Sequence, residues 1–252
     1  MVKPKKRLGQ HFLTDENIAR KIISSLSGNI KNVVEIGSGI GILTKYLLQN
    51  QEINAFFFEV DHESVEYLKL KYPSIGTRLI EADFLGYDLR LVPGPFAVIG
   101  NFPYNISSQI LFKILDHHDR IPEVIGMFQK EVAERIASPA GSKKYGILSV
   151  LVRAFYNIEY LFTVSENVFY PPPKVKSAVI RLIRNDQAKL NCNEALFFRV
   201  VKTAFNQRRK TLRNALKSLP LSDSANKEGF LSKRAEQLSV EDFVFLTNEI
   251  KS

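Results

Sequence analysis

The stretch VVEIGSGIG, residues 33–41, decides the fold, because it joins a short apolar run to three glycines at alternate positions. Glycines at the end of a buried strand let the backbone turn tightly and approach a ligand closely. The spacing Gly37-x-Gly39-x-Gly41 differs from the GxGxxG of dinucleotide-binding loops, where a pyrophosphate lies on the helix N-terminus. A carboxylate at Glu35 would repel phosphate and would suit a ligand with a cationic end. Taken alone, the loop is equally compatible with a tight structural turn.

Short β-rich runs alternate with helical patterns around this loop. Such alternation is typical of an α/β fold in which successive βα units build a mostly parallel sheet. Two later β-rich runs, 156–164 and 176–184, flank the loop that contains Pro171-Pro172-Pro173, and we expect them as late strands at the edge of the sheet, one of them antiparallel. The alternating runs are residues 32–37, 42–50, 53–60, 62–72, 78–83, 95–100, 107–118, 123–129 and 130–138.

The pattern changes near residue 185, where a polar stretch, 185–194, precedes a mostly helical region. We therefore predict an α/β domain over residues 1–187 and a small C-terminal helical domain over 188–252. The apolar stripe of Phe198, Val201 and Phe205 leads onto Arg208 and Arg209, which a single buried helix would not place there. We expect either a break in the helix or an exposed basic edge at this point. The expected helical patterns are residues 195–219, 230–239 and 240–250.

Two further carboxylates complete a candidate pocket. Glu59 follows Gly41 by 18 residues and ends a β-rich run, where an acid can accept hydrogen bonds from both hydroxyls of a ribose. Asp83 ends the next β-rich run and would accept a hydrogen bond from the amino group of an adenine. With Glu35 and the glycine loop, these residues predict a pocket for a nucleoside that lacks phosphate and carries positive charge. S-adenosylmethionine fits that description.

The stretch IGNFPYNIS, residues 99–107, follows the β-rich run at 95–100 and places an amide at the carboxyl edge of the expected sheet. The Asn101 side-chain oxygen and the Phe102 carbonyl could accept both N–H hydrogens of an adenine amine and aim its nitrogen at a methyl donor. Pro103 would stiffen the turn, and Tyr104 could stack on the base. The alternative is a proline turn with core aromatics.

Composition narrows the classes of protein. The chain has 252 residues, 45% of them hydrophobic, and no run of eighteen apolar residues, so no membrane span is expected. The N-terminus lacks the apolar stretch of a secretory signal, and a single cysteine, Cys192, fits a reducing compartment; we expect a cytoplasmic protein. Four scattered histidines and one cysteine predict no metal site. Nothing in the sequence requires more than a monomer.

The net charge of +9 is clustered and predicts a polyanionic partner. A solubilising charged face is the alternative, and an anionic membrane surface is a weaker one because no amphipathic anchor helix is visible. The candidate RNA-binding residues are Lys5, Lys6, Arg7, Arg208, Arg209, Lys210 and Arg213.

Six motifs in one order resemble the KsgA family of ribosomal RNA adenine dimethyltransferases over nearly the whole chain. They are GQHFL (9–13), EIGSGIGILT (35–44), NFPYNISS (101–108), QKEVAERI (129–136), VFYPPPKVKSAVI (168–180) and FNQRRKTLRNAL (205–216). The resemblance implies a Rossmann-like class I methyltransferase fold that transfers methyl groups from S-adenosylmethionine, leaving S-adenosylhomocysteine. The acceptors would be the N6 atoms of two adjacent adenosines in a hairpin near the 3′ end of small-subunit (16S) rRNA.

The resemblance also implies roles for single residues. His11 and Leu13 would join the cofactor pocket, and Phe169 would contact the target base opposite Tyr104. One departure is visible, since the family usually has leucine or isoleucine where this chain has Phe102.

Three other functions remain open from the sequence. A related methyltransferase family that modifies large-subunit RNA and confers macrolide resistance shares the glycine loop and an Asn-x-Pro-Tyr turn. A non-catalytic RNA-binding assembly or transcription factor on the same fold would have lost cofactor or turn residues, and all are present here. A DNA adenine methyltransferase is disfavoured because the acidic or serine form of its turn is absent.

Overall fold

The structure is a computed structural model that describes residues 2–186, 189–222, 224 and 229–250. It divides into two compact units, one of Met1–Ala133 with Ile158–Arg184, the other of Glu134–Asn157 with Asn185–Ser252. The predicted domain boundary at 187–188 lies outside the described residues. The chain passes from the first unit to the second close to that boundary, but the second unit also contains the segment 134–157.

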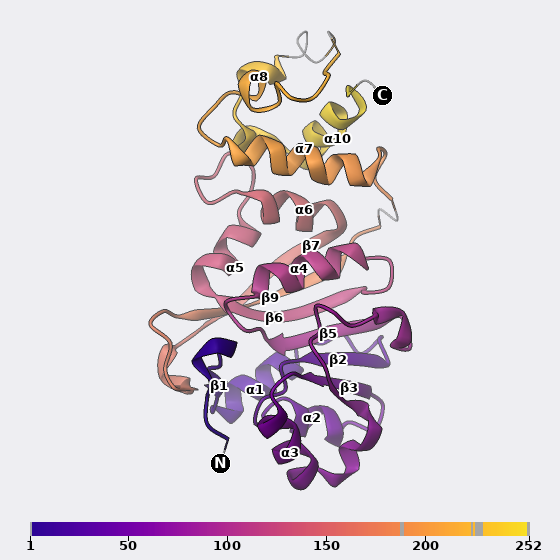
Figure 1. Ribbon diagram of the computed structural model, residues 1–252, viewed down its shortest axis with the longest axis vertical. Helices are drawn as coiled ribbons and strands as arrows, with labels where there is room; N and C mark the ends of the chain where they lie inside the picture. Colours follow the sequence, from indigo (N-terminus) through magenta and orange to yellow (C-terminus); the bar gives the residue numbers. More distant parts are fainter. Residues whose placement is uncertain (1, 187–188, 223, 225–228, 251–252) are drawn as a thin grey trace. The chain divides into compact units, whose positions relative to one another are not determined.

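A seven-stranded sheet in the order β4-β3-β2-β5-β6-β9-β7 forms the first unit. The pairs from β4 to β6 are parallel and β9 runs antiparallel to β6, so the prediction of a largely parallel sheet with an antiparallel late strand is confirmed. Figure 1 shows β3, β2, β5, β6 and β9 one above another in this order. The strands are β2 (Asn32–Ile36), β3 (Asn54–Glu59), β4 (Leu79–Glu81), β5 (Phe96–Asn101), β6 (Glu123–Gln129), β7 (Tyr156–Val164) and β9 (Ser177–Arg184).

The late strands differ in one respect from the expectation. β7 is the edge strand, whereas β9 is inserted between β6 and β7. The burial pattern explains this placement, because Ser177–Ile180 are buried in succession, as expected of a strand covered on both faces, while β7 has a mostly exposed or half-buried middle.

The sheet brings the predicted site residues to one edge. Parallel strands end at the same edge of a sheet, and β2, β3 and β5 are neighbours that end at Ile36, Glu59 and Asn101. The middles of these strands are apolar, and polar residues stand at or next to their ends, as in NAFFFE of β3.

Helices and a small second sheet complete the first unit. Asp15 caps α1, because its side chain accepts hydrogen bonds from the amides of Asn17 and Ile18. A two-stranded sheet pairs β1 (Phe12–Leu13) with β8 (Phe169–Tyr170), which ties the N-terminal segment to the loop before β9. The remaining elements are α1 (Glu16–Ile23), α2 (Thr44–Gln49), α3 (His62–Lys71), α4 (Ser107–Asp116), α5 (Lys130–Ala137), which continues into the second unit, and the 3₁₀ turns η1 (Lys6–Leu8), η2 (Pro73–Arg78), η3 (Leu89–Leu91) and η4 (Glu166–Val168).

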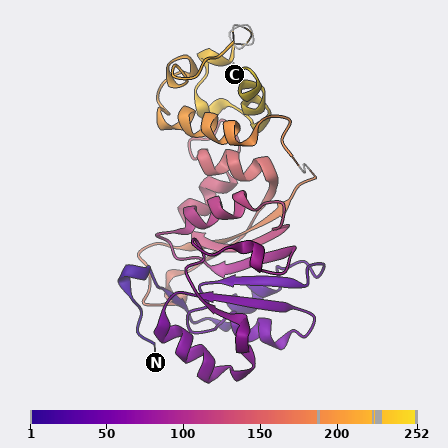
Figure 2. The same ribbon diagram turned by 45° about the vertical axis from the view of Figure 1, so that its right-hand side comes forward.

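The second unit is helical. Its central helix, α7 (Glu194–Asn206), is orange in Figure 2 and packs against α6 (Ile147–Phe155), α8 (Leu212–Ala215) and α10 (Val240–Asn248). Of the two alternatives expected at the arginine pair, a break is present, because α7 ends at Asn206 and α8 starts at Leu212; Arg209 is also exposed. The expected helix over 230–239 consists of two 3₁₀ turns, η5 (Phe230–Ser232) and η6 (Ala235–Gln237).

Candidate active site

A cavity of 290 Å³ lies at the carboxyl edge of the sheet, within the first unit. It is lined by the N-terminal segment 7–12, the glycine loop, the end of β3, the segment 82–85 and the turn 101–106. The structure therefore brings most of the predicted site residues together from five separate segments. Those that line the cavity are Arg7, His11, Gly37, Gly39, Glu59, Asp83, Asn101, Phe102, Pro103 and Tyr104; Leu13, Glu35, Gly41 and Phe169 lie outside its lining.

Glu59 is held rigidly at the cavity wall. Its Oε2 accepts from the amide of Gly39 at 2.7 Å, and its Oε1 accepts from the amides of Val60 and Asp61, both at 2.9 Å. A carboxylate has about four acceptor sites, so this arrangement leaves capacity for one ribose hydroxyl. The predicted contact with both hydroxyls would require one backbone donor to give way. Burial raises the pKa of Glu59, and the backbone amides oppose that shift.

Gly37, Gly39 and Gly41 all have positive φ, but they differ in what surrounds them. A Cβ on Gly37 would lie 3.8 Å from Pro103, and a Cβ on Gly39 would lie 3.0 Å from the Phe12 ring, so both face cavity-lining residues. A Cβ on Gly41 would approach Tyr72 and Leu68 of the α3 region at 2.7 and 2.8 Å. Gly41 is therefore required for close helix packing.

Glu35 is a buried carboxyl group directly beneath the glycine loop. Its Oε2 accepts from the Thr44 hydroxyl at 2.7 Å. Burial raises the pKa of Glu35 to about 8, the Thr44 hydrogen bond opposes the shift, and the nearby charge of Glu59 adds to it. Without a ligand, the Glu35 carboxyl is mostly protonated at neutral pH. A cation bound nearby would favour its ionised form.

Asp83 keeps one carboxylate oxygen available. Its Oδ1 accepts from the amide of Leu85 at 2.9 Å, and no donor from the described residues reaches Oδ2. Two rings that also line the cavity, those of Phe58 and Phe84, meet edge to face with centroids 5.5 Å apart. An apolar wall with a free carboxylate oxygen suits an adenine with its exocyclic amine.

The turn after β5 carries two acceptors. The Asn101 Nδ2 donates to the carbonyl of His11 at 2.8 Å, which orients the amide and fixes which atom is the oxygen. Within the described part of the chain, neither Asn101 Oδ1 nor the Phe102 carbonyl accepts a hydrogen bond. The Phe102 ring points into the core, where its exposed fraction is 1% and it lies edge-on to Phe128 at 5.2 Å.

Tyr104 is fixed from two sides. Its hydroxyl bonds to the Ser177 hydroxyl at 2.5 Å, and the His11 ring stacks on its face with centroids 5.6 Å apart and planes at 26°. A base that stacks on Tyr104 must therefore use the opposite face. Burial raises the pKa of Tyr104, so its phenol stays protonated at neutral pH and is no general base.

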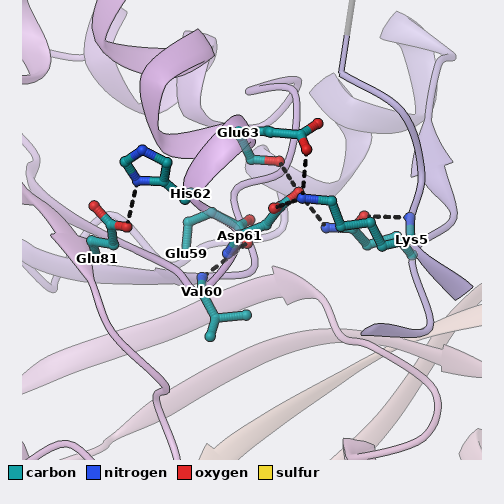
Figure 3. A network of polar contacts seen from close by, with 9 residues as sticks. Lys5, Glu59, Val60, Asp61, His62, Glu63 and Glu81 are labelled. Atoms are coloured by element: carbon teal, nitrogen blue, oxygen red, sulfur yellow. Dashed lines mark hydrogen bonds and ion pairs between the residues drawn. The ribbon is translucent and has the colours of Figure 1, made fainter. Parts of the chain in front are cut away.

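The N-terminal segment Lys5–Leu13, which we call the strap, is attached at both ends. Figure 3 shows Lys5 reaching toward Asp61 and Glu63; its ammonium group pairs with the Asp61 carboxylate and lies 3.0 Å from that of Glu63. Gln10 Nε2 also donates to Asp61, at 3.3 Å. Lys5 was a candidate for RNA contact; its charge is compensated within the protein, and its RNA role stays a prediction.

Sequence reasoning assigned the basic residues of the strap, His11 and Leu13, but missed Gln10 and Phe12. Both residues belong to the motif GQHFL, residues 9–13, and this membership is the signal that could have identified them. The contacts themselves span 51 to 56 residues, so no local pattern reveals them.

The C-terminal basic residues differ in their surroundings. Arg208 is half-buried, pairs with Glu236 at 3.3 Å and donates to the carbonyl of Lys143. Arg209, Lys210 and Arg213 are exposed, and within the described residues no acid pairs with them. Lys6 and Arg7 of the strap are exposed as well.

Neither a metal site nor a membrane-spanning helix is present among the described residues. No group of three or more His, Cys, Asp and Glu side chains is arranged to hold a metal ion. In that part of the chain, no helix is long and apolar enough to cross a membrane.

The whole sequence is similar to known proteins. It matches the family description "Ribosomal RNA adenine dimethylase" over residues 1–252. Two relatives named ribosomal RNA small subunit methyltransferase A come from Flavobacterium johnsoniae and Cytophaga hutchinsonii. The first is 58% identical, with 100% of this chain and 97% of the relative covered; the second is 57% identical, with 98% and 97% covered.

Two solved structures are similar over almost their whole length. A dimethyladenosine transferase from Plasmodium falciparum has a TM-score of 0.79 at 27% identity and covers 94% of this chain and 96% of that one. The 23S rRNA methyltransferase ErmE has a TM-score of 0.70 at 25% identity, with 95% and 99% covered.

Proposed function

The chain belongs to the ribosomal RNA adenine dimethylase family, and from this premise we propose that it methylates two adjacent adenosines of small-subunit (16S) rRNA. It transfers methyl groups from S-adenosylmethionine to N6 of adenosines in a hairpin near the 3′ end, giving N6,N6-dimethyladenosine. The relatives at 57–58% identity carry the small-subunit name, which favours this substrate over the large-subunit RNA of ErmE.

The residues of the cavity fit S-adenosylmethionine. Gly37 and Gly39 line the cavity without a side chain that would fill it, Glu59 and Asp83 offer free acceptor sites, and Glu35 can ionise in response to positive charge. When bound, S-adenosylmethionine supplies a methyl group on a sulfonium sulfur and leaves as S-adenosylhomocysteine. We assign cofactor contact to His11, Gly37, Gly39, Glu59, Asp83 and Asn101, and support from behind the lining to Leu13, Glu35 and Gly41.

The observation that carries the mechanism is the pair of unengaged acceptors on one turn, Asn101 Oδ1 and the Phe102 carbonyl. They accept the two N–H hydrogens of the adenine amine and orient its nitrogen toward the methyl group. Pro103 keeps the turn stiff, and Tyr104 stacks on the base. Phe169 is buried outside the cavity lining, so its expected contact with the base requires its ring to turn toward the cavity. After transfer the nitrogen releases a proton to solvent, so positioning supplies most of the catalysis.

The two predicted domains would then have different roles. Residues 1–187 carry methyl transfer and residues 188–252 dock RNA through exposed cations. We also propose that the protein acts as a monomer. We place the reaction in the cytoplasm, with the immature small subunit as partner.

Labelling of isolated ribosomal particles tests the function. Purified protein with tritiated S-adenosylmethionine should label small subunits that lack the modification, with dimethyladenosine recovered near the 3′ end of their RNA. Label found only in large-subunit RNA or in DNA would contradict the assignment.

A substitution at Asn101 tests the role of the acceptor pair, Asn101 Oδ1 and the Phe102 carbonyl, which we call the adenine clamp. Asn101→Ala should reduce methyl transfer at least a hundredfold, by loss of an oriented acceptor, while its loss of S-adenosylmethionine binding, measured by calorimetry, should be much smaller than the loss of transfer. Because Asn101 also holds the His11 carbonyl, Asn101→Asp is the matched variant that keeps an oxygen acceptor but loses that N–H donor. Transfer at the parent rate by Asn101→Ala would exclude the clamp.

A further inference from the structure

The loop Tyr170–Lys176, which we call the rim loop, is attached at both ends to residues of the cavity. The Pro171 carbonyl lies 2.7 Å from His11 Nδ1, so that nitrogen carries the proton and donates. At the other end, Ser177 bonds to the hydroxyl of Tyr104. Since His11 stacks on Tyr104, both anchors of the rim loop converge on the proposed site of the target base.

The rim loop presents an aromatic ring to solvent. Strand pairing places Tyr170 opposite Phe12 and Phe169 opposite Leu13. Side chains alternate along a strand, and Phe169 is buried at 4% exposure while Tyr170 is 58% exposed. Tyr170 therefore lies outside the cavity, opposite Phe12, which lines it.

The rest of the loop combines apolar surface with positive charge. Val175 is 47% exposed, and Lys174 and Lys176 are exposed on either side of it. No acid among the described residues pairs with either lysine. Pro171-Pro172-Pro173 restrict the backbone, so little conformational entropy is lost when the loop binds a partner.

An exposed ring with cations in the same loop is the combination that binds single-stranded nucleic acid, because bases stack on aromatic side chains and lysines neutralise phosphates. Single exposed apolar residues need no explanation. Here, however, the ring, the cations and the restricted backbone occur together on seven residues that are anchored to the cavity.

We propose that Tyr170 stacks on the adenosine adjacent to the one whose N6 occupies the cavity, while Lys174 and Lys176 contact its phosphates. This inference rests on the proposed function and adds a positioning residue to it. Tyr170 holds the second adenosine of the pair at the rim, so that it enters the cavity once the first has been modified.

The test uses immature small subunits as the RNA probe and four variants of the full chain. Tyr170→Ala and Tyr170→Leu should raise the KM for subunits on the order of tenfold, in line with loss of one stacked base. Tyr170→Phe should match the parent, because stacking needs the ring and not the hydroxyl. Tyr160→Ala is the matched control, since Tyr160 is an exposed tyrosine, at 38%, on β7.

Mass spectrometry of the RNA at partial conversion supplies a readout that a purely structural role would not change. Tyr170→Ala should accumulate subunits with one dimethylated adenosine, where the parent yields both, while the KM for S-adenosylmethionine and the Tm stay unchanged. The inference is overturned if Tyr170→Ala equals the parent in both readouts, or if Tyr170→Phe is as impaired as Tyr170→Ala. Failure of the proposed function would instead appear in the parent enzyme, as absence of label in the subunits.

Discussion

At the scale of single residues, there is a structural reason for the phenylalanine at position 102, where the family usually has leucine or isoleucine. Its ring occupies space left by two glycines, since a Cβ on Gly100 or Gly126 would approach the ring at 2.9 and 2.7 Å. The backbone carbonyl, which is the proposed working group, accepts no hydrogen bond within the described residues. The phenylalanine therefore serves core packing, and we expect it to leave adenine binding by the carbonyl unchanged.

Replacement of Phe102 by the residue usual in the family tests this separation. Phe102→Leu should lower the free energy of unfolding by about 1–2 kcal/mol, because it leaves a small cavity above the glycines. Methyl transfer should stay within a few-fold of the parent. Urea unfolding measures the change in stability, and the labelling assay measures methyl transfer. Phe128→Leu is the control, because it removes the other ring of the same aromatic pair. Loss of transfer in a folded Phe102→Leu would show that the ring shapes the pocket.

Glu35 predicts a pH dependence of cofactor binding. Its folded-state pKa of about 8 lies above the ordinary 4.5, so the folded protein retains a proton that the unfolded chain has lost. This group therefore destabilises the fold progressively as pH rises from about 4.5 to about 8. A cationic ligand favours the carboxylate, so binding releases the proton and affinity should rise with pH by at most about tenfold per unit.

Calorimetry between pH 6 and 9, in buffers of different ionisation enthalpy, measures that proton release. S-adenosylhomocysteine has one positive charge fewer and should show a weaker dependence. Glu35→Gln should flatten the profile for S-adenosylmethionine; an unchanged slope in that variant would assign the proton to another group.

At the scale of elements, the strap forms one wall of the cavity and is held by ionic contacts at its start. The hydrogen bonds of Lys5 to Asp61 and then to Glu63 raise the pKa of Lys5. Lys5→Met keeps the length of the side chain but removes the charge that fastens the strap. We expect a several-fold higher Kd for S-adenosylmethionine and faster proteolysis near the N-terminus. Lys6→Met, at an exposed neighbour, is the control and should leave the Kd unchanged.

Most strands could be predicted from the sequence because each is a short apolar run with a polar end. NAFFFE of β3, for example, coincides with the predicted run 53–60. The alternation does not predict α6, because a short and mostly apolar run such as ILSVLVRAF can form either a buried strand or a helix, and its pattern alone does not decide between them. The site residues at strand ends were predictable for the same reason as the strands. The strap and the pairing of Tyr170 with Phe12 were not, since both depend on contacts between distant segments.

At the scale of the whole molecule, the charge of +9 should make RNA binding strongly dependent on salt. Some of these cations are exposed and can contact RNA, whereas others are already paired with acids of the protein. Arg209→Gln combined with Lys210→Gln removes two exposed charges and should reduce the slope of log K against log salt by about 1.5, at roughly 0.7–0.9 per phosphate. Arg208→Gln removes an arginine held by Glu236 and the Lys143 carbonyl, so it should lower stability and leave the slope almost unchanged. Filter binding to small subunits from 50 to 200 mM salt, with thermal unfolding in parallel, measures both. An unchanged slope in the double variant would move the RNA-binding surface away from the turn between α7 and α8.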